Sequence, residues 1–264
     1  MVTLTPPVET DDLPAGPLLA ARLVVLFPLW PGFLGLARPN PDVAAFAWLD
    51  WTEQVPGIVW LIGAALYLGC AVALWLAIMP RAAAAVAGSI ILVGPLVDLG
   101  AYANNRILAG LVLVLLGLYE PRTHLWPLRI QLSVMYGAAA LNKVFDPDWR
   151  DGTFIEHWTD DLLDLRIHGA VRDLWSGIDR LVGWSAFVIE ATLAVLFLLP
   201  GRIRWAVAAA LAFHGGMLVF TEGEISWLFA YVVGATLVAF SLPRSIWPPV
   251  AALLTLRVAE LVIS

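Results

Sequence analysis

The sequence has few charged residues and almost no lysine or cysteine. Charged residues make up 14% of the 264 residues, and a single lysine, Lys143, stands against fourteen arginines. The single cysteine, Cys70, lies within an apolar segment. One thiol cannot form a CxxC pair or a thiolate metal cluster, so dithiol redox chemistry within this chain is excluded. The net charge is -6 and no basic stripe is visible, so we expect no nucleic-acid partner.

Apolar residues dominate what is present. They make up 61% of the chain, and the mean hydropathy is +0.84. Such a composition, with long uncharged runs, is typical of an integral membrane protein in contact with the lipid bilayer. Residues 1–17 contain three acidic residues and no lysine or arginine, so they lack the positive n-region of a cleaved signal peptide. We therefore expect a cytoplasmic tail over 1–17 and a single transmembrane domain over 18–264.

Hydropathy predicts an all-α, polytopic transmembrane bundle of eight spans, or nine if the last segment crosses. A span needs about 20 residues, so the segment 107–119 must extend into its polar flanks. The segment 247–263 carries Arg257 and Glu260 on one helical face, so it either buries this pair or lies at the membrane surface. The apolar segments are 18–37, 56–79, 82–103, 107–119, 127–145, 182–199, 203–220, 225–241 and 247–263.

The charges of the connecting loops predict the orientation. The loops after the second, fourth, sixth and eighth segments contain arginine, whereas the loops between them are acidic or nearly uncharged. By the positive-inside rule these four loops and the N terminus are cytoplasmic. The expected location is a bacterial plasma (inner) membrane, because the alanine- and arginine-rich composition is typical of a GC-rich bacterial genome.

The connection 146–181 has a helical pattern of its own. Apolar residues recur at three- and four-residue steps from Val171 to Val182, and charged residues occupy the opposite face. A weaker pattern runs from Ile155 to Leu165. We expect two amphipathic helices here, which lie on the outer membrane surface.

Polar residues inside the apolar segments are the candidates for function, because each costs free energy in a bilayer. Lys143 falls at the predicted outer end of the fifth segment. A lysine at the edge of hydrocarbon pairs, reaches to water or loses its proton, and a neutral amine can act as a base. The remaining candidates are Asp98, Asn104, Asn105, Arg106, Glu190, His214 and Glu222.

Structural roles compete with these functional ones. A lysine beside Trp149 is a common interfacial anchor. Arg106 can pair with Asp98, and His214 can be a satisfied core histidine. For Glu190 a structural hydrogen bond competes with catalysis. The four histidines show no HxxxH or HxxE spacing, so we expect no metal site.

The stretch from Tyr136 to Gly152 resembles a known family signature. Tyr136, Lys143, the Asp148-Trp149 pair and Gly152 stand where the vitamin K-dependent gamma-carboxylase membrane domain and its bacterial relatives, the HTTM family, have a tyrosine, a lysine, Asp-Trp and a glycine. Phe213-His214 is similar to the Phe-His helix of this family, and Asn104-Asn105 is similar to its Asn-Asn-His turn. The resemblance covers roughly residues 95–235.

The resemblance implies a function for Lys143. In the carboxylases of the family, the matching lysine is the base that deprotonates vitamin K hydroquinone, which oxygen then converts to a strong base that acts on a glutamate. An enzyme of this kind would be a carboxylase and quinol-epoxidase-like lyase or an oxidoreductase. Its cofactor would be a reduced quinone, and Asn104, Asn105, Arg106, Tyr136, Trp149 and His214 would assist Lys143 or bind substrate.

This chain also departs from the family. Asn105 or Arg106 stands where the family has a histidine, depending on a one-residue gap. We also expect this protein to act without the large extracytoplasmic domain of the animal carboxylases. Two functions remain open. The first is lysine-dependent proton abstraction from a lipid-soluble quinol or a peptide substrate at the outer face. The second is a non-catalytic maturation or accessory protein for a secreted peptide or protein.

Overall fold

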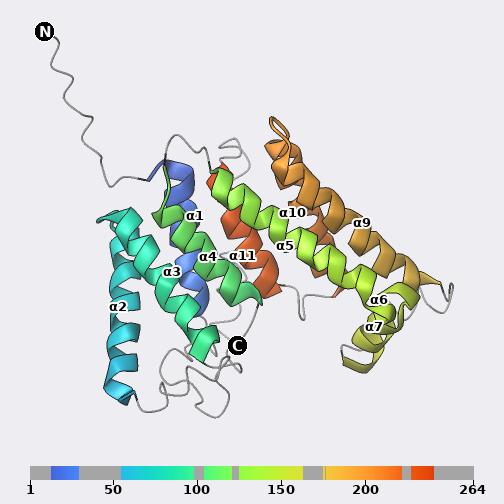
Figure 1. The fold of residues 1–264 in the computed structure, drawn as a ribbon, viewed down its shortest axis with the longest axis horizontal. Coiled ribbons are helices and arrows are strands. Elements are labelled where there is room, and N and C mark those ends of the chain that lie inside the picture. The colour runs from blue at the N-terminus through green and yellow to red at the C-terminus, as the bar shows by residue number, and fades with distance from the viewer. Residues whose placement is uncertain are drawn as a thin grey trace, which may run out of the picture. The chain divides into compact units, whose positions relative to one another are not determined.

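The structure is a computed structural model, and it describes residues 13–29, 55–97, 104–120, 125–162, 175, 177–221 and 227–240. Every regular element in these ranges is a helix (Figure 1), so the predicted all-α class is confirmed. The chain divides into two compact units, Met1–Pro121 and Arg122–Ser264.

Small residues bring α3 and α4 of the first unit together. A Cβ atom on Gly88 of α3 would lie 2.6 Å from the carbonyl oxygen of Gly110 on α4, so only glycine allows this approach. Arg22 of α1 donates to the carbonyl oxygens of Leu74 and Trp75 at the end of α2, each over 2.9 Å. Both carbonyls lie in the last turn of α2, where the regular partners four residues ahead within the helix are missing. The helices of this unit are α1 (Ala15–Leu26), the 3-10 turn η1 (Phe27–Leu29), α2 (Gly57–Trp75), α3 (Pro80–Val97) and α4 (Asn104–Gly117).

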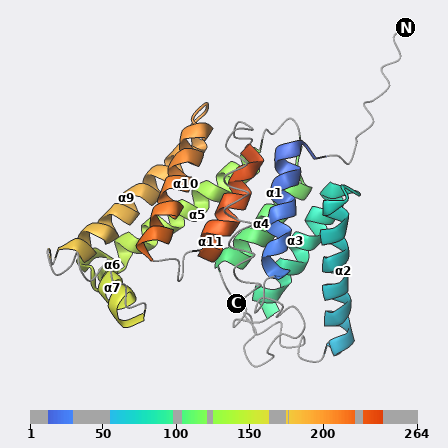
Figure 2. The same ribbon diagram turned by 180° about the vertical axis from the view of Figure 1, so that it is seen from behind.

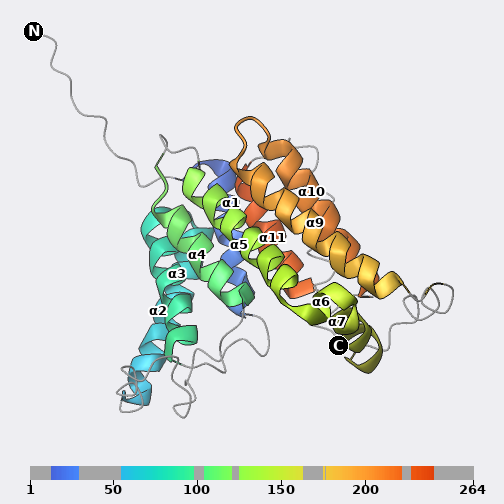
Figure 3. The ribbon, with the colours of Figure 1, turned by 45° about the vertical axis from the view of Figure 1, so that its right-hand side comes forward.

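The second unit contains two long helices that run antiparallel to each other, α5 and α9. Figure 2 shows α5 beside α9 and α10 from behind, and Figure 3 shows the short helices α6 and α7 at the end of α5. The elements of this unit are α5 (Trp126–Phe145), α6 (Pro147–Asp151), α7 (Thr153–Glu156), the π-helix η7 (His157–Leu162), α9 (Ile178–Leu198), α10 (Ile203–Phe220), α11 (Trp227–Leu237) and the 3-10 turn η8 (Val238–Phe240).

A helix occupies each of the first eight predicted apolar segments, at least in part. By length and composition, three helices are suited to cross a membrane: α2, α9 and α10. The remaining described helices are shorter or less apolar, so eight spans stay a prediction. The segment 247–263 lies outside the described residues.

Helix α2 exposes large apolar side chains along its whole length. Exposed apolar surfaces of this extent are unfavourable in water and favourable against lipid chains. The pattern is therefore the one expected of a helix that faces a bilayer. The exposed residues on α2 include Ile58, Leu61, Ile62, Leu66, Val72 and Trp75.

The connection 146–181 agrees only in part with the prediction. Its first half is helical, as α6, α7 and η7. In its second half, Ile178, Leu181 and Val182 do not belong to a separate surface helix. They form the start of α9, which continues to Leu198, and Asp179 of the expected polar face is buried. The prediction was wrong here because no helix-breaking residue separates the amphipathic pattern from the apolar run after it. Residues 163–174 lie outside the described ranges.

Candidate functional site

One face of α5 is polar and packs against α9. Arg129, Ser133, Tyr136 and Lys143 recur at steps of four, three and seven residues, which places them on one helical face. Since a polar group buried without a hydrogen bond is costly, each needs a partner on a neighbouring helix. This stripe also makes α5 less apolar than the helices beside it.

The cytoplasmic half of the stripe, in the predicted orientation, binds the backbone of α9. Arg129 donates through Nε to the carbonyl oxygen of Phe197 over 2.7 Å and through Nη2 to that of Leu199 over 2.8 Å. Its guanidinium also lies 4.1 Å from the centre of the Trp126 ring. Ser133 donates to the carbonyl oxygen of Ala194 over 2.7 Å. These contacts fix the register of α5 on α9 and satisfy carbonyls at the end of α9.

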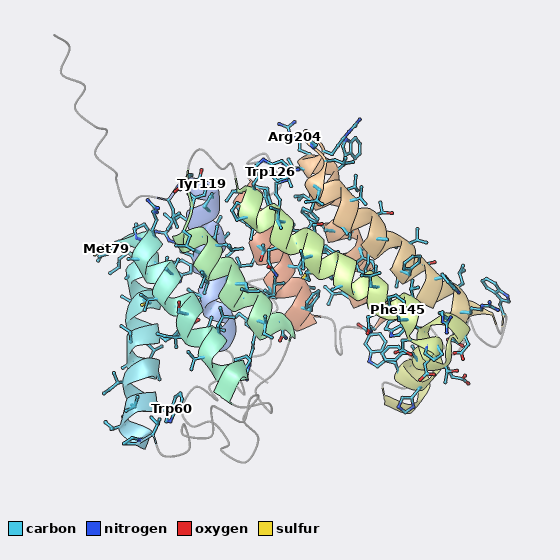
Figure 4. All side chains as sticks on the ribbon, viewed as in Figure 1. Trp60, Met79, Tyr119, Trp126, Phe145 and Arg204 are labelled. Atoms are coloured by element: carbon cyan, nitrogen blue, oxygen red, sulfur yellow. The ribbon has the colours of Figure 1, made fainter. Side chains whose placement is uncertain are left out.

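Figure 4 shows the ends of α5. Trp126 and Phe145 lie at opposite ends of the helix, and Arg204 at the start of α10 lies toward the Trp126 end. Lys143 therefore stands at the end of α5 that is far from Arg202, between α9 and α10, and Arg204, at the start of α10.

Lys143 forms an ion pair with Glu190 of α9. The amine Nζ donates to Oε1 over 3.0 Å and lies 2.8 Å from Oε2. The side chains are 11% and 10% exposed, so both are largely removed from solvent. Two opposite charges this close offset part of the cost of burying each other, whereas either one alone would be strongly unfavourable. The amine that the sequence predicts at this position is thus one half of a buried pair.

Trp149 covers the amine from another side. Nζ lies 4.3 Å from the centre of the Trp149 ring, within the range of a cation–π interaction. The tryptophan is carried by α6, which starts directly after α5 because Asp146 accepts a hydrogen bond from the Asp148 amide over 3.0 Å and Pro147 occupies the first turn. Gly183 on α9 allows the close approach, since a Cβ there would lie 2.6 Å from the Trp149 carbonyl oxygen.

Gly152 makes the turn between α6 and α7. Its φ of +98° is in the left-handed region, and a Cβ would lie 2.7 Å from the backbone nitrogen of Arg180 on α9. A residue with a side chain is both strained and obstructed there. Next to this turn, the backbone amide of Thr153 donates to Asp151 over 2.9 Å and lowers the pKa of that carboxyl below its usual value.

Aromatic rings extend from Trp149 along α7 and η7. The rings of Trp149 and Phe154 are stacked at 4.1 Å with an interplanar angle of 20°. The ring centres of Phe154 and Trp158 are 6.3 Å apart. Trp158 is the second residue of η7, after His157. The amine of Lys143 therefore lies at one end of a row of flat apolar surfaces.

A second polar pair lies two turns along α5 from Lys143. The hydroxyl oxygen of Tyr136 is 2.9 Å from Nε2 of His214 on α10, and both side chains are buried. The Tyr136 ring is stacked on Phe197 of α9 at 5.8 Å with an interplanar angle of 4°. Phe229 of α11 lies 5.3 Å from the His214 ring. His214 is thus a hydrogen-bonded histidine within an aromatic core.

The predicted site residues fall into three groups. The structure brings Lys143, Trp149 and Glu190 together, and it brings Tyr136 and His214 together. Asn104, Asn105 and Arg106 begin α4 in the first unit, where the Arg106 amide donates to Asn105 Oδ1 over 2.9 Å. Asp98 and Glu222 lie outside the described residues. In the part of the chain that the structure describes, no group of three or more histidine, cysteine, aspartate or glutamate side chains is arranged to hold a metal ion.

Sequence analysis identified Glu190 as a candidate residue but did not predict that it pairs with Lys143. The signal that could have found the pair is the spacing on α9: Glu190 and Phe197 are seven residues apart, as are Tyr136 and Lys143 on α5. Antiparallel packing of the two helices sets these two faces against each other. The stacking of Phe197 on Tyr136 has no separate sequence signal.

Comparison of the chain with protein-family models, with curated proteins and with solved structures found no match.

Proposed function

We propose that this chain is a multi-pass protein of the bacterial plasma membrane, with eight or nine spans and a cytoplasmic N terminus. Support comes from the three helices suited to cross a membrane and from the apolar surface of α2. Arg202 and Arg204, at the start of α10, lie at the opposite end of the α5–α9 pair from Lys143, which fits a site at the extracytoplasmic side.

We propose that Lys143 is the centre of a proton-accepting site for a lipid-soluble quinol. One observation carries this proposal: the Lys143 amine is buried, ion-paired with Glu190 and held at the face of Trp149. A structural anchor would expose its ammonium to water or lipid headgroups. Within such a pair the ammonium can first pass a proton to the carboxylate, which leaves a neutral amine beside a neutral acid. The amine can then take the proton of a bound hydroxyl, and the ammonium that forms pairs with the anion left on the ligand, so no buried charge stands alone.

The surroundings of the pair suit a quinol ring. The stacked rings of Trp149 and Phe154, with the tilted ring of Trp158 next to Phe154, form an aromatic surface beside the amine, and flat aromatic ligands bind well against such surfaces. A reduced quinone, when bound, supplies the acidic hydroxyl and the electrons. The chain supplies the ring surface through Trp149 and Phe154 and the proton acceptor through Lys143 and Glu190.

The resemblance to the HTTM family points the same way. The lysine of that family's signature corresponds to Lys143, and the Asp-Trp pair to Asp148 and Trp149. Membership of this family is part of the proposal. Among the further members of the signature, Tyr136 contacts His214, so these two residues are proposed to support the site by fixing α5 against α9 and α10.

The test is hydroquinone-dependent oxygen uptake by the purified protein in lipid nanodiscs. Deprotonation makes a hydroquinone far easier to oxidise, so wild-type protein should accelerate uptake above the uncatalysed background. Lys143→Ala and Lys143→Arg should both abolish this acceleration, because alanine removes the acceptor and arginine stays protonated. Undiminished uptake by a Lys143→Ala protein that extracts and elutes normally would end the proposal.

A second function, accessory to the maturation of a secreted peptide or protein, is favoured by a different observation. Arg129, Ser133, Tyr136 and Lys143 all bind partners on α9 or α10, as polar residues do when they hold membrane helices together. Co-purification of a secreted protein from the native membrane, without hydroquinone consumption, would favour this function.

A further inference from the structure

Arg22 is the only charged residue of α1, and its side chain is spent on the end of another helix. The guanidinium donates to the carbonyl oxygens of Leu74 and Trp75 and lies 5.8 Å from the centre of the Trp75 ring. A charge within an apolar helix is costly in a bilayer. Here it takes the place of the water that normally binds the last carbonyls of a helix.

The last turn of α2 is satisfied entirely by the protein. The carbonyl oxygens of Val72, Ala73 and Leu74 accept from the amides of Leu76, Ile78 and Ala77 over 2.9, 2.8 and 3.2 Å, and those of Leu74 and Trp75 accept from Arg22. Ala77 has a φ of 55°, the left-handed conformation with which helices often end. A helix end of this kind needs no water, which is the condition for a helix that ends within hydrocarbon.

The α2–α3 turn, Leu76–Met79, is apolar and exposed. Leu76, Ile78 and Met79 are 64%, 55% and 64% exposed, and the turn contains no charged residue. Figure 4 shows Met79 at the end of α2 opposite to Trp60. The exposed apolar face of α2 therefore continues without a break into the turn.

The loop between α9 and α10 is built differently. Its left-handed residue is Gly201, with a φ of 71°, and the exposed and charged Arg202 follows directly. Glycine and a charged side chain are typical of a turn in water. The α2–α3 turn has neither.

Helix α1 also extends past the end of α2. Arg22 lies at Trp75, and the Tyr67 hydroxyl donates to the carbonyl oxygen of Val25, so α1 and α2 run antiparallel. The seven residues of α1 before Arg22 carry no charge, and they lengthen the helix by about 10 Å. The end of α2 therefore lies well inside the apolar part of α1.

We propose that the α2–α3 turn is embedded in the cytoplasmic leaflet of the bilayer, with Leu76, Ile78 and Met79 among the lipid chains, and that Arg22 allows this by replacing water at the end of α2. The inference concerns a surface other than the Lys143 site, and it rests only on the membrane location in the proposed function. Lipid is the partner because the turn continues the apolar face of α2. Arg81, the first charged residue after the turn, then lies near the anionic lipid headgroups.

Thiol labelling tests the location of the turn. In a Cys70→Ala background, Ile78→Cys and Arg202→Cys each introduce one thiol at an exposed position. In permeabilised cells, a membrane-impermeant maleimide should label Arg202→Cys and leave Ile78→Cys unlabelled, because a thiol in hydrocarbon is neither ionised nor accessible to the reagent. Both should be labelled in SDS. Equal labelling of the two in membranes would place the turn in water and overturn the proposal.

A nitroxide on the same two thiols separates lipid from protein as the cover of the turn. At Ile78→Cys the nitroxide should collide more often with oxygen, which is concentrated in hydrocarbon, than with a water-soluble nickel chelate. At Arg202→Cys the order should be reversed. Few collisions with either at Ile78→Cys would mean that a second copy or another protein covers the turn, which also overturns the proposal.

The role of Arg22 has its own test. Arg22→Leu leaves the Trp75 carbonyl without its donor, so water should follow and the labelling of Ile78→Cys should rise about tenfold, as expected for the loss of a hydrogen bond to a charged group. Arg204→Leu, which removes an exposed arginine from α10, is the control and should change nothing. Unchanged protection in a folded Arg22→Leu protein would refute the role of Arg22. If this variant does not fold, the comparison of Ile78→Cys with Arg202→Cys still decides where the turn lies.

Extraction with alkaline carbonate distinguishes failure of this proposal from failure of the proposed membrane location. Release of the protein into the soluble fraction would refute both. Retention in the membrane together with a freely labelled Ile78→Cys would refute the embedded turn alone.

Discussion

Tyr136 and Lys143 stand two helical turns apart on the same face of α5, and each contacts a residue of α9. Tyr136 stacks on Phe197 and binds His214, while Lys143 binds Glu190. The seven-residue spacing on α5 is matched by the same spacing between Glu190 and Phe197 on α9. The two contacts therefore support a single register of α5 on α9. Loss of either contact should weaken the other.

Removal of one half of the ion pair should destabilise the protein strongly. Glu190→Leu leaves the Lys143 ammonium buried without a counter-charge, which costs about 3–5 kcal/mol. The double variant Lys143→Met/Glu190→Leu should recover most of this loss, because an apolar pair of similar volume needs no desolvation. Unfolding by denaturing detergent, titrated in mixed micelles, measures both. A double variant as unstable as the single one would argue against a direct contact.

Tyr136→Phe should keep the stacking on Phe197 and lose only the hydrogen bond to His214. The free energy of unfolding should fall by about 1–3 kcal/mol, since a nitrogen of the buried imidazole is left unsatisfied. Adding His214→Phe should restore part of the loss, because both polar partners are then gone. The same detergent titration applies, and strict additivity of the two substitutions would contradict the contact.

The approach of α6 to α9 should depend on Gly183. Gly183→Ala places a Cβ about 2.6 Å from the Trp149 carbonyl oxygen, so α6 must shift and the tryptophan must leave the Lys143 amine. We expect a loss of about 1–3 kcal/mol and a shift of the tryptophan emission. Gly69→Ala on α2 is the matched control, since nothing lies within 4 Å of its Cβ position. Equal behaviour of the two variants would be inconsistent with the packing described.

The single cysteine makes the orientation easy to test. In a Cys70→Ala background, Arg150→Cys on α6 and Arg202→Cys before α10 each introduce one exposed thiol. A membrane-impermeant maleimide should label Arg150→Cys in intact cells and Arg202→Cys only after permeabilisation, because the loop between α9 and α10 is predicted to be cytoplasmic. The opposite pattern would invert the topology and place the Lys143 site on the cytoplasmic side.

Hydropathy predicted the helical class and the position of each described apolar helix, because the length and burial of such helices depend mainly on local composition. The boundary between the expected surface helix and α9 was predicted wrongly. The amphipathic residues from Ile178 onward form the first turns of α9, and no break separates them from the apolar residues that follow. The partner of Lys143 was not predicted from the sequence, for another reason. Glu190 is 47 residues away, and the matching seven-residue spacings on α5 and α9 identify it as the partner only once the two helices are known to pack antiparallel. The contacts of Tyr136 with Phe197 and His214 depend on the same packing.

The most direct test of the account separates a site that acts on a ligand from a pair that only joins two helices. Hydroquinone-dependent oxygen uptake should be measured for the wild type and for Lys143→Met/Glu190→Leu in nanodiscs of the same lipid. We predict that the double variant folds with nearly the stability of the wild type and shows only the uncatalysed rate. Undiminished uptake by this folded double variant would contradict it.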